Sequence, residues 1–493
     1  MISVEVIIAT LALAIGSFMN VLDSTIVNVS LSHIAGDFAV APTQGTWVIT
    51  SYAVAEAIFL PLIGWLTKRF GIVRQYIFAT LFFTCASVLC GLSFSFEFLL
   101  FARILQGVVG ASMIPLSQTL MLGFYPKEKR SIALGIWSMT IILAPVFGPL
   151  IGGWITDSLS WRWCFYINVP FGILSTYIVH TIFKRKGYKD KTVKEPIDFF
   201  GLLFLAIGIG ALQIMLDKGN DLNWFSSKFI IVLAITSFIF LVLLVIWEWY
   251  QDNPVVNIRL FLNKNFSVGS VCLTLGSIAF FSAVVVIPLW LQNYMGYTAL
   301  SSGVATCTMG IASLFLAPIL GSLLNKFDAR KFTVIGFIAF SISSFCFSYT
   351  PDVTEGYIAF SRFITGIGLA FFFIPLNVIT LSDVSPSDLA GASGLYNFMR
   401  NIGSSFGTSL SINYWTNKIT LHHANLVSAI QPGNPNYTSF INMLPGPLQA
   451  KLEVIDNIIT LQSAIMGVND LMVISGVIML LLIPFVFIAK RNI

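Results

Sequence analysis

Charged residues are scarce in this chain. Asp, Glu, Lys and Arg make up only 10% of its 493 residues, and hydrophobic residues make up 56%, whereas a soluble domain has roughly 25% charged and about 45–50% apolar residues. This balance excludes an ordinary soluble enzyme. The 27 basic and 22 acidic residues leave a net charge of +5, and no basic run is interleaved with aromatic residues. Nucleic acid is therefore excluded as a partner.

Cysteine, histidine and nucleotide-binding motifs are equally sparse. The six cysteines lie almost entirely in apolar runs and form no CxxC motif, so we expect neither disulfides nor zinc. The GxxxxGK[ST] phosphate loop is absent, which argues against an ATP-driven pump. Four scattered histidines, without HExxH or a suitably placed GxSxG, argue against a membrane-embedded enzyme. We expect no catalytic residues, no metal and no cofactor.

Long apolar runs are what the sequence does contain. Each has roughly 18 to 25 residues, enough to cross about 30 Å of hydrocarbon as a helix. The first run has no basic leader and no small-residue cleavage site, so we interpret it as a retained helix and not as a signal peptide. The sequence therefore predicts an all-α integral membrane protein with fourteen spans, at residues 5–29, 46–67, 75–96, 98–123, 132–156, 164–183, 198–216, 229–249, 266–290, 303–325, 332–350, 357–381, 390–415 and 468–489.

The distribution of basic residues predicts the orientation of the chain. An even number of spans places both termini on one side of the membrane. If that side is the cytoplasm, 19 of the 27 Lys and Arg residues lie in inner loops and tails, 5 lie outside and 3 lie within spans. Basic residues near span ends resist translocation. We therefore expect both termini to be cytoplasmic.

An internal repeat with an offset near 259 residues divides the chain. Arg103 and Gly107 correspond to Arg362 and Gly366. The repeat predicts two parallel six-helix halves, residues 1–183 and 266–493, joined by a basic cytoplasmic linker and two inserted helices at 184–265. Two such halves around a central site are typical of a secondary transporter, which rocks one half against the other.

One outer connection is much longer than the others. It spans residues 417–467 and contains four prolines, so we expect a long loop with a short helical element. The adjacent residues His422 and His423 point to different faces of a helix and lack further ligands, which argues against metal binding.

Several motifs carry a family resemblance. They are Gly64-Trp-Leu-Thr-Lys68-Arg69-Phe-Gly71, Arg103-x-x-Gln106-Gly107-x-x-Gly110, and Ala144-Pro145-x-x-Gly148-Pro149-x-x-Gly152-Gly153. They resemble the signature motifs of the major facilitator superfamily. The strings Leu22-Asp23-Ser-Thr-Ile-Val-Asn-Val29 and Trp161-Arg-Trp-Cys-Phe-Tyr-Ile-Asn168-Val-Pro170 are similar to hallmarks of its fourteen-spanner drug:proton antiporters, and nearly the whole chain resembles the EmrB multidrug exporters.

The resemblance implies a major facilitator fold and export of hydrophobic toxic compounds across the bacterial inner membrane, driven by the proton gradient and without a cofactor. It also implies an EmrA-like periplasmic adaptor and an outer-membrane channel as partners, a surface loop without a partner being the competing interpretation. A proton-coupled importer or exporter of a narrow metabolite on the same fold is the alternative function. The resemblance also assigns a hinge motif (Gly135, Pro145, Gly148, Pro149, Gly152 and Gly153) and a cytoplasmic loop motif (Gly64, Lys68, Arg69 and Gly71). Lys68 stands where the superfamily usually has an acid, so the usual loop-to-helix ion pair is in doubt.

Charges inside the spans are candidates for function because a charge in hydrocarbon costs several kcal/mol. Asp23 and Arg103 each lie five or six residues from the outer end of their spans, roughly 7 to 9 Å deep at about 1.5 Å per residue. The two can therefore meet. An arginine lowers the proton affinity of a nearby carboxylate and an apolar cavity raises it, so a change of pairing can drive antiport. We hypothesise that Asp23 binds the proton and Arg103 releases it; a purely structural ion pair is the alternative.

The sequence leaves open the roles of three other charged residues and of a set of polar residues within the spans. Glu56 is either a second protonation or cation-selecting site or a structural carboxyl group. Arg362 has no acid in the seventh helix of the chain that would mirror Asp23, and Arg400 either contacts substrate or binds backbone carbonyls. The 44 Phe and 13 Met are compatible with an adaptable apolar pocket. Candidate cavity residues are Asn20, Gln118, Asn168, Asn377, Tyr396 and Asn397.

Overall fold

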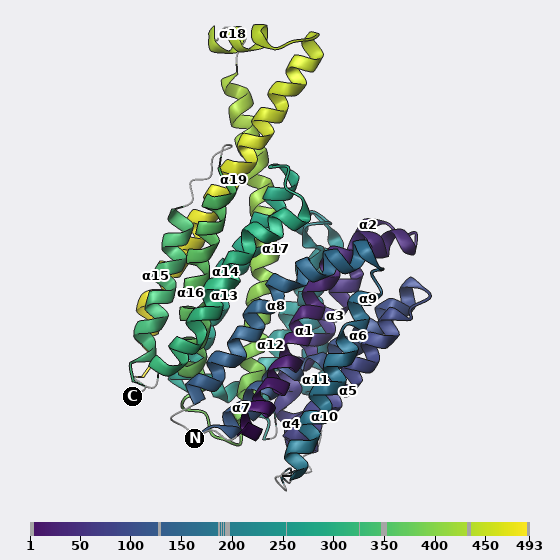
Figure 1. Cartoon of the computed structure of the whole chain (residues 1–493), viewed down its shortest axis with the longest axis vertical. Coiled ribbons are helices and arrows are strands. Elements are labelled where there is room, and N and C mark those ends of the chain that lie inside the picture. The colour runs from purple at the N-terminus through teal and green to yellow at the C-terminus, as the bar shows by residue number, and fades with distance from the viewer. Residues whose placement is uncertain are drawn as a thin grey trace.

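The fold was obtained as a computed structural model. It describes residues 4–126, 130–185, 188, 190, 192, 198–252, 254–324, 326–346, 353–430 and 435–490. All regular elements in these ranges are helices, most of them long and roughly aligned in one bundle (Figure 1). Both ends of the chain lie at the same end of this bundle, which we call the termini end.

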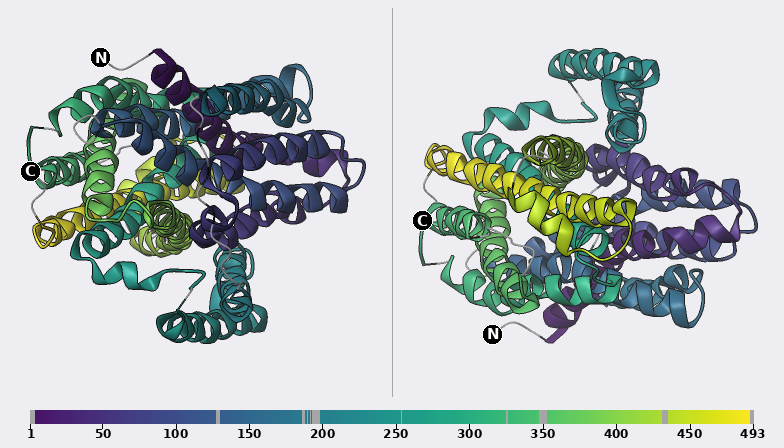
Figure 2. Two further views of the ribbon diagram at one scale, coloured as in Figure 1. Left: turned by 90° about the horizontal axis from the view of Figure 1, so that it is seen from below. Right: turned by 90° about the horizontal axis from the view of Figure 1, so that it is seen from above.

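The first part of the chain builds one group of helices. In order, they are α1 (Val4–Asp37), the short α2 (Pro42–Gly45), α3 (Trp47–Phe59) continuing through η1 (Leu60–Leu62) into α4 (Ile63–Phe70), α5 (Ile72–Gly91), α6 (Phe96–Gly110) with α7 (Met113–Phe124), α8 (Arg130–Ser158), and α9 (Trp163–Tyr166) with α10 (Asn168–Arg185). Two further helices follow, α11 (Phe199–Gly219) and α12 (Lys228–Tyr250), with η3 (Trp224–Ser226) between them. Figure 2 shows these two at the edge of the bundle.

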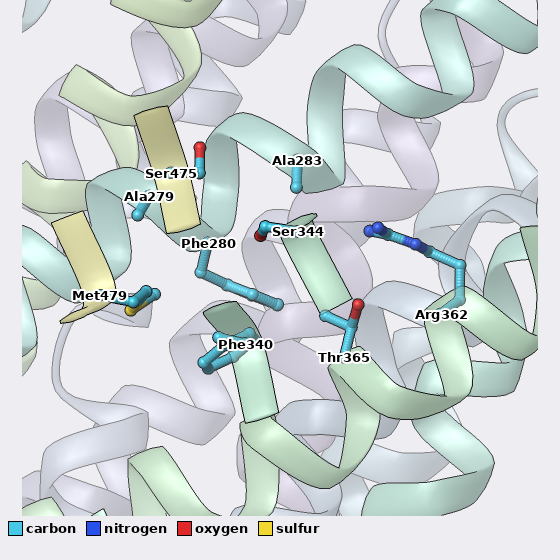
Figure 3. A pocket seen from close by; sticks show the side chains of 9 residues that line it. All are labelled: Ala279, Phe280, Ala283, Phe340, Ser344, Arg362, Thr365, Ser475 and Met479. Atoms are coloured by element: carbon cyan, nitrogen blue, oxygen red, sulfur yellow. The ribbon is translucent and has the colours of Figure 1, made fainter. Parts of the chain in front are cut away.

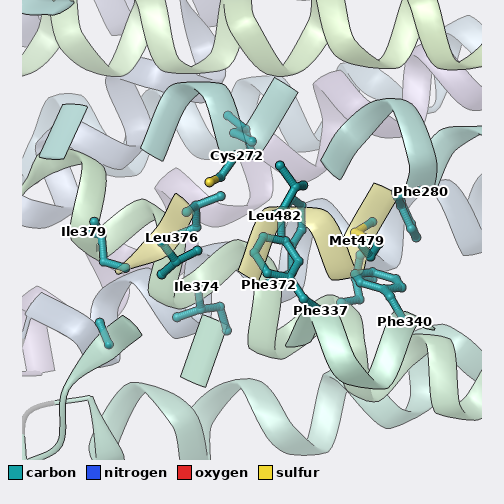
Figure 4. Packing of buried hydrophobic residues seen from close by; sticks show 14 of the residues in the cluster. Cys272, Phe280, Phe337, Phe340, Phe372, Ile374, Leu376, Ile379, Met479 and Leu482 are labelled. Carbon is teal, nitrogen blue, oxygen red and sulfur yellow. The ribbon is translucent and has the colours of Figure 1, made fainter. Parts of the chain in front are cut away.

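The rest of the chain builds a second group. After η4 (Ile258–Leu262) come α13 (Lys264–Asn293), α14 (Ala299–Leu323), α15 (Ala329–Phe345), α16 (Glu355–Leu381), α17 (Leu389–Ala429), α18 (Pro435–Met443) and α19 (Leu448–Val486). Within this group α13 packs on α17 and α19, and α16 packs on α14 and α15. Aromatic and aliphatic side chains fill the space between them, including Phe280, Phe337, Phe340 and Phe372 (Figure 4).

Each predicted span coincides with a helix or with consecutive helices. Among the described residues, eleven helices are long and apolar enough to cross a membrane. The other three predicted spans fall on α8, on the 17-residue α15 and on the more polar α17. Apolar side chains on the outside of the bundle are widely exposed, as on α12, where Phe238 is 71% exposed. Such a surface is suited to lipid and not to water, and the chain is a multi-pass membrane protein.

The segment expected as a long loop at 417–467 is largely helical. α17 continues to Ala429 and α19 begins at Leu448, so both run far beyond the spans that hydropathy marks and form a hairpin that projects from the bundle (Figure 1). Short α18 lies at its tip, as the expected helical element. Lys418 Nζ and His422 Nε2 both contact Asp470 Oδ2, at 3.1 and 3.0 Å, and tie α17 to α19. Hydropathy marks only the lipid-facing part of a helix, which is why the sequence missed these extensions.

The two groups of helices contact each other at the termini end. Gln118 Nε2 of α7 donates to Asn377 Oδ1 of α16 at 2.7 Å, and these residues are 259 positions apart, the offset of the internal repeat. Two residues at equivalent positions of the repeat, which we call repeat mates, can be in contact only near the axis that relates the two halves. A methyl group added to Gly135 of α8 would lie 2.8 Å from Ala317 O, and one added to its repeat mate Gly394 would lie 2.8 Å from Leu60 O. Each half thus presents an equivalent glycine to the backbone of the other.

Candidate functional site

Asp23 and Arg103 form an ion pair inside the first group of helices. Arg103 Nη1 of α6 donates to Asp23 Oδ2 of α1 at 2.6 Å, and the two side chains are 1% and 0% exposed. Asp23 Oδ1 accepts two more hydrogen bonds, from Gln106 Nε2 at 2.9 Å and from Asn168 Nδ2 of α10 at 2.7 Å. The carboxylate is therefore held by donors from two helices besides its own. The two residues do meet at one level, as their depths predicted.

Arg103 makes further contacts besides the ion pair. Its Nε donates to Val48 O of α3 at 3.1 Å, and its Nη1 donates to Gln106 Oε1 at 2.7 Å. The guanidinium carbon lies 4.3 Å from the centre of the Tyr52 ring and 5.7 Å from that of Phe165. A buried ion pair is tolerated when hydrogen bonds satisfy both partners. Here the Asp23 carboxylate accepts three hydrogen bonds, and Arg103 donates from both Nε and Nη1. Removing either partner would leave the other charge buried and unpaired.

A second polar cluster links α3 to the other half. Tyr52 OH accepts from Asn20 Nδ2 at 3.0 Å and donates to Glu56 Oε1 at 3.5 Å. Glu56 Oε2 in turn accepts from Asn401 Nδ2 of α17 at 3.2 Å. Glu56 therefore lies between the halves, with Tyr52 and Asn401 as its hydrogen-bond partners. The two clusters meet at Tyr52.

Arg362 lies in a different setting from its repeat mate Arg103. It is 2% exposed on α16, and its Nε donates to Ser361 Oγ at 3.3 Å. It borders a small pocket that Phe280, Phe340 and Thr365 also line (Figure 3). Arg400 of α17 is partly buried, and its charge acts on Tyr396 and Glu56. The structure thus places Arg400, and not Arg362, beside the cluster between the halves.

The hinge motif of α8 packs against α1. Methyl groups added to Gly148 and Gly152 would lie 2.8 Å from Thr25 Cβ and 2.9 Å from Ile26 O, far inside normal contact. One added to Gly153 would lie at an ordinary 3.8 Å from Val29 Cγ1. Pro145 lies within the same helix, as does Pro149, whose side chain lies outside the described set. Two of these glycines therefore permit backbone contact between α8 and α1, directly beside Asp23 in sequence.

The cytoplasmic loop motif lies at the termini end. A methyl group on Gly64 would lie 3.0 Å from Gly391 Cα of the other half. Gly71 ends α4 with φ of 89°, a conformation that favours glycine. Asp190 then accepts from Val73 N and Arg74 N at 3.1 and 3.2 Å and caps α5. The acid of this loop comes from the chain after α10.

The two basic residues of the cytoplasmic loop motif lie at the end of α4. Lys68 and Arg69 occupy the last turn of α4, where cations favour the helix dipole. Lys68 also lines a pocket that Asp252 and Asp388 border.

The candidate cavity residues fall into three groups. Asn168 and Asn20 belong to the clusters around Asp23 and Tyr52. Gln118 bridges to Asn377 at 2.7 Å and to Asn397 at 3.3 Å, so these three form polar contacts between the halves. Tyr396 is buried on α17. All six are 0–2% exposed.

Sequence reasoning did not assign several members of these clusters to a site, although it named Gln106 within a motif. Gln106 and Ser87 complete the shell of Asp23, since Ser87 Oγ accepts from Gln106 Nε2 at 2.8 Å and from Asn168 Nδ2 at 3.2 Å. Gln106 stands three residues after Arg103, on the same helix face, and that spacing could have revealed it. Tyr52 and Asn401 carried no comparable signal, because an aromatic or an amide in a span usually packs in the interior.

Comparisons with known proteins bear on the family and the fold. Residues 13–408 match the Major Facilitator Superfamily. The chain is 42% identical to the multidrug export protein EmrB of Escherichia coli K12, over 99% of this chain and 96% of that protein. It is 38% identical to the fatty acid resistance protein FarB of Neisseria gonorrhoeae, over 98% and 95%. The solved structure of the proton:xylose symporter XylE superposes with a TM-score of 0.57 at 14% identity, covering 95% of each chain.

Proposed function

This chain belongs to the Major Facilitator Superfamily and, within it, to the EmrB-type multidrug export permeases, and we propose that it exports hydrophobic toxic compounds in exchange for protons. It is a secondary transporter and not an enzyme. The observation that carries proton coupling is the buried Asp23–Arg103 pair, with N···O at 2.6 Å. No other described pair of oppositely charged side chains is buried so completely.

Asp23 is proposed to bind the transported proton. In the present arrangement its carboxylate accepts hydrogen bonds from Arg103, Gln106 and Asn168, and we assign this paired arrangement to the step after proton release. A movement of α1 against α6 that breaks these bonds would leave a carboxyl group in an apolar, dry environment, where the protonated form is favoured. The tight contact of Gly148 and Gly152 with α1 is where a movement of α8 would be transmitted to Asp23.

Glu56 is proposed as the second acid of the cycle. It lies between the halves and contacts Asn401 at 3.2 Å, so rocking of the halves would change its surroundings directly. A carboxylate there would favour compounds that carry a positive charge, or take up a second proton. The partly buried Arg400 nearby, on the other half, would be the group with which such a compound competes.

The orientation and partners are also proposals. The excess of basic residues in the loops at the termini end supports a cytoplasmic location for that end, in the inner membrane. The hairpin of α17 and α19 would then project into the periplasm. It exposes large apolar side chains, among them Met443 at 81% and Leu448 at 63%. Such a projection supports docking of a periplasmic adaptor of the EmrA type that leads to an outer-membrane channel.

Inverted membrane vesicles energised to an acid interior provide the test. A pH-sensitive dye reports proton release when lipophilic compounds are added, and intact protein is compared with Asp23→Asn. We expect compound-dependent release that is lost in Asp23→Asn, with Glu453→Gln, at an exposed acid of the hairpin, as a control carboxyl variant outside the pair. Normal release by Asp23→Asn would refute its role, and no release with any compound would favour an importer or a narrow metabolite substrate.

A further inference from the structure

Tyr52 is the residue at which the two polar clusters meet. Its ring lies under the Arg103 guanidinium, with the carbon 4.3 Å from the ring centre. Its hydroxyl group contacts Glu56 on the following turn of α3. The chain of contacts runs from Asp23 through Arg103 and Tyr52 to Glu56, and from there to Asn401 of the other half.

The packing of α3 holds Tyr52 at this junction. Val48, Tyr52 and Glu56 recur every four residues and so share one face of the helix. Val48 O accepts from Arg103 Nε at 3.1 Å, which fixes the guanidinium beside that face. A methyl group on Gly107 of α6 would lie 2.9 Å from Ala55 Cβ, so α6 and α3 are in close contact here. The position of Tyr52 under Arg103 is therefore set by both helices.

We propose that Tyr52 is a positioning residue that makes the protonation of Glu56 depend on the state of the Asp23–Arg103 pair. This inference rests on the proposed function, in which both acids take part in proton exchange. A cation over an aromatic ring is attracted to its face, and its field polarises the hydroxyl bond at the ring edge. When Asp23 takes up a proton, the Arg103 charge loses its counter-charge, and the Tyr52 hydroxyl becomes a stronger hydrogen-bond donor to Glu56.

Few charged groups among the described residues act on Glu56 and on Tyr52. Those acting on Glu56 are Arg400 of α17 and Arg103 of α6. Those acting on Tyr52 are Glu56, Asp23 and Arg103. Arg400 belongs to the other half, so its effect on Glu56 changes when the halves move. Arg103 is paired with Asp23, so its effect changes when Asp23 binds or releases a proton. Tyr52 is the side chain that contacts Arg103.

The experiment is a double-mutant cycle on the pH profile of compound-dependent proton release in inverted vesicles. The four proteins are intact chain, Tyr52→Phe, Glu56→Gln and the double variant. Tyr52→Phe keeps the ring under Arg103 and removes only the hydroxyl group. We expect Glu56→Gln to shift the midpoint of the profile by about one pH unit in the intact chain, the size a neighbouring charge produces, and by much less when Tyr52 is Phe. Equal shifts in both backgrounds would overturn the proposal.

Two further variants separate positioning from folding. Tyr76→Phe is a matched control, because Tyr76 is a buried tyrosine of the same half whose hydroxyl lies 3.0 Å from Ser175 Oγ, outside the clusters. It should leave the profile unchanged. Glu56→Asp keeps the charge but shortens the side chain, so it should reproduce the profile of Tyr52→Phe; if it instead behaves as intact protein, the contact with Tyr52 does not matter. Loss of coupling in Tyr52→Phe while Asp23→Asn still releases protons normally would mean that the proposed role of Asp23, and not the link, has failed.

Discussion

The environment of single carboxylates decides what each of them can do. Asp23 and Asp37 both lie on α1, and each binds an arginine, but Asp23 is 0% exposed whereas Asp37 is 50% exposed. A charge buried like Asp23 cannot be moved without exchanging its partners, which suits a transported proton. An exposed pair such as Asp37 with Arg162 exchanges freely with water, which suits a structural role.

Asp37 gives a prediction for pH. Hydrogen bonds from Trp161 Nε1 and Arg162 Nη1, both 2.8 Å, hold the pKa of Asp37 below its usual value. A lowered pKa in the folded state adds stability above the unfolded pKa of about 3.9, and this is lost as the pH falls through the folded value. Asp37→Asn should therefore lower the melting temperature in detergent slightly at pH 7, and the difference should shrink as the pH falls below about 3.9. Glu453→Gln, a change at an exposed acid of the hairpin, is the control, and a difference that persists in acid would contradict the prediction.

At the scale of the element, α8 packs against α1 through glycines, which have no side chain. Without a hydrophobic force between helices in lipid, association depends on close van der Waals contact, and small residues allow it. Gly148 and Gly152 make that contact, and Gly153 faces a wider gap. The glycines of one motif therefore differ in how much they constrain the helix pair.

This difference predicts unequal effects of alanine. A methyl group on Gly152 would meet Ile26 Cγ1 at 2.7 Å and Ile26 O at 2.9 Å, and such overpacking costs about 1–3 kcal/mol. We expect Gly152→Ala to lower thermal stability and to slow drug-dependent proton release. Gly153→Ala is the matched control and should resemble the unmodified chain in both assays. If the two variants behave alike, the contact of α8 with α1 is not the constraint.

For the molecule as a whole, several polar contacts between the halves lie at the termini end. Gln118–Asn377, Thr119–Ser393 and the approach of Gly64 to Gly391 all occur there. The inserted α11 adds contacts nearer the opposite end, where Gln213 Nε2 donates to Ser405 Oγ of α17 at 3.0 Å and Lys218 Nζ donates to Thr46 Oγ1 just before α3. The halves are therefore in direct contact at the proposed cytoplasmic side, and α11 touches both of them.

A substitution at Gly64 tests whether the contact between the halves at the termini end closes the cytoplasmic side of the transporter. Gly64→Leu would drive a side chain into Gly391, so the halves could not close at the termini end. We expect transport to fall at least tenfold, a change of about 1.4 kcal/mol in the balance of states. A cysteine placed at the buried Ser393, with the native cysteines replaced, should become more reactive to an impermeant maleimide added to inverted vesicles. Gly123→Leu is the control, because nothing lies within 4 Å of a methyl group there; unchanged labelling in Gly64→Leu would argue against a gate.

Sequence alone predicted the fold class, the positions of the long helices, the repeat and the meeting of Asp23 with Arg103. These follow from one-dimensional quantities: hydropathy along each span, the spacing of motifs, and depth counted in residues from a span end. Hydropathy stops at the lipid boundary, and so it could not predict that α17 and α19 continue as a hairpin.

Only the tertiary structure decided which side chains share a site. Asn168, a candidate cavity residue, donates to Asp23, and Glu56 lies between Tyr52 and Asn401. A span fixes the height of a residue in the membrane, because every residue adds the same rise to a helix. It leaves the rotation and neighbours of that helix open, since these depend on how small residues on all the helices pack together.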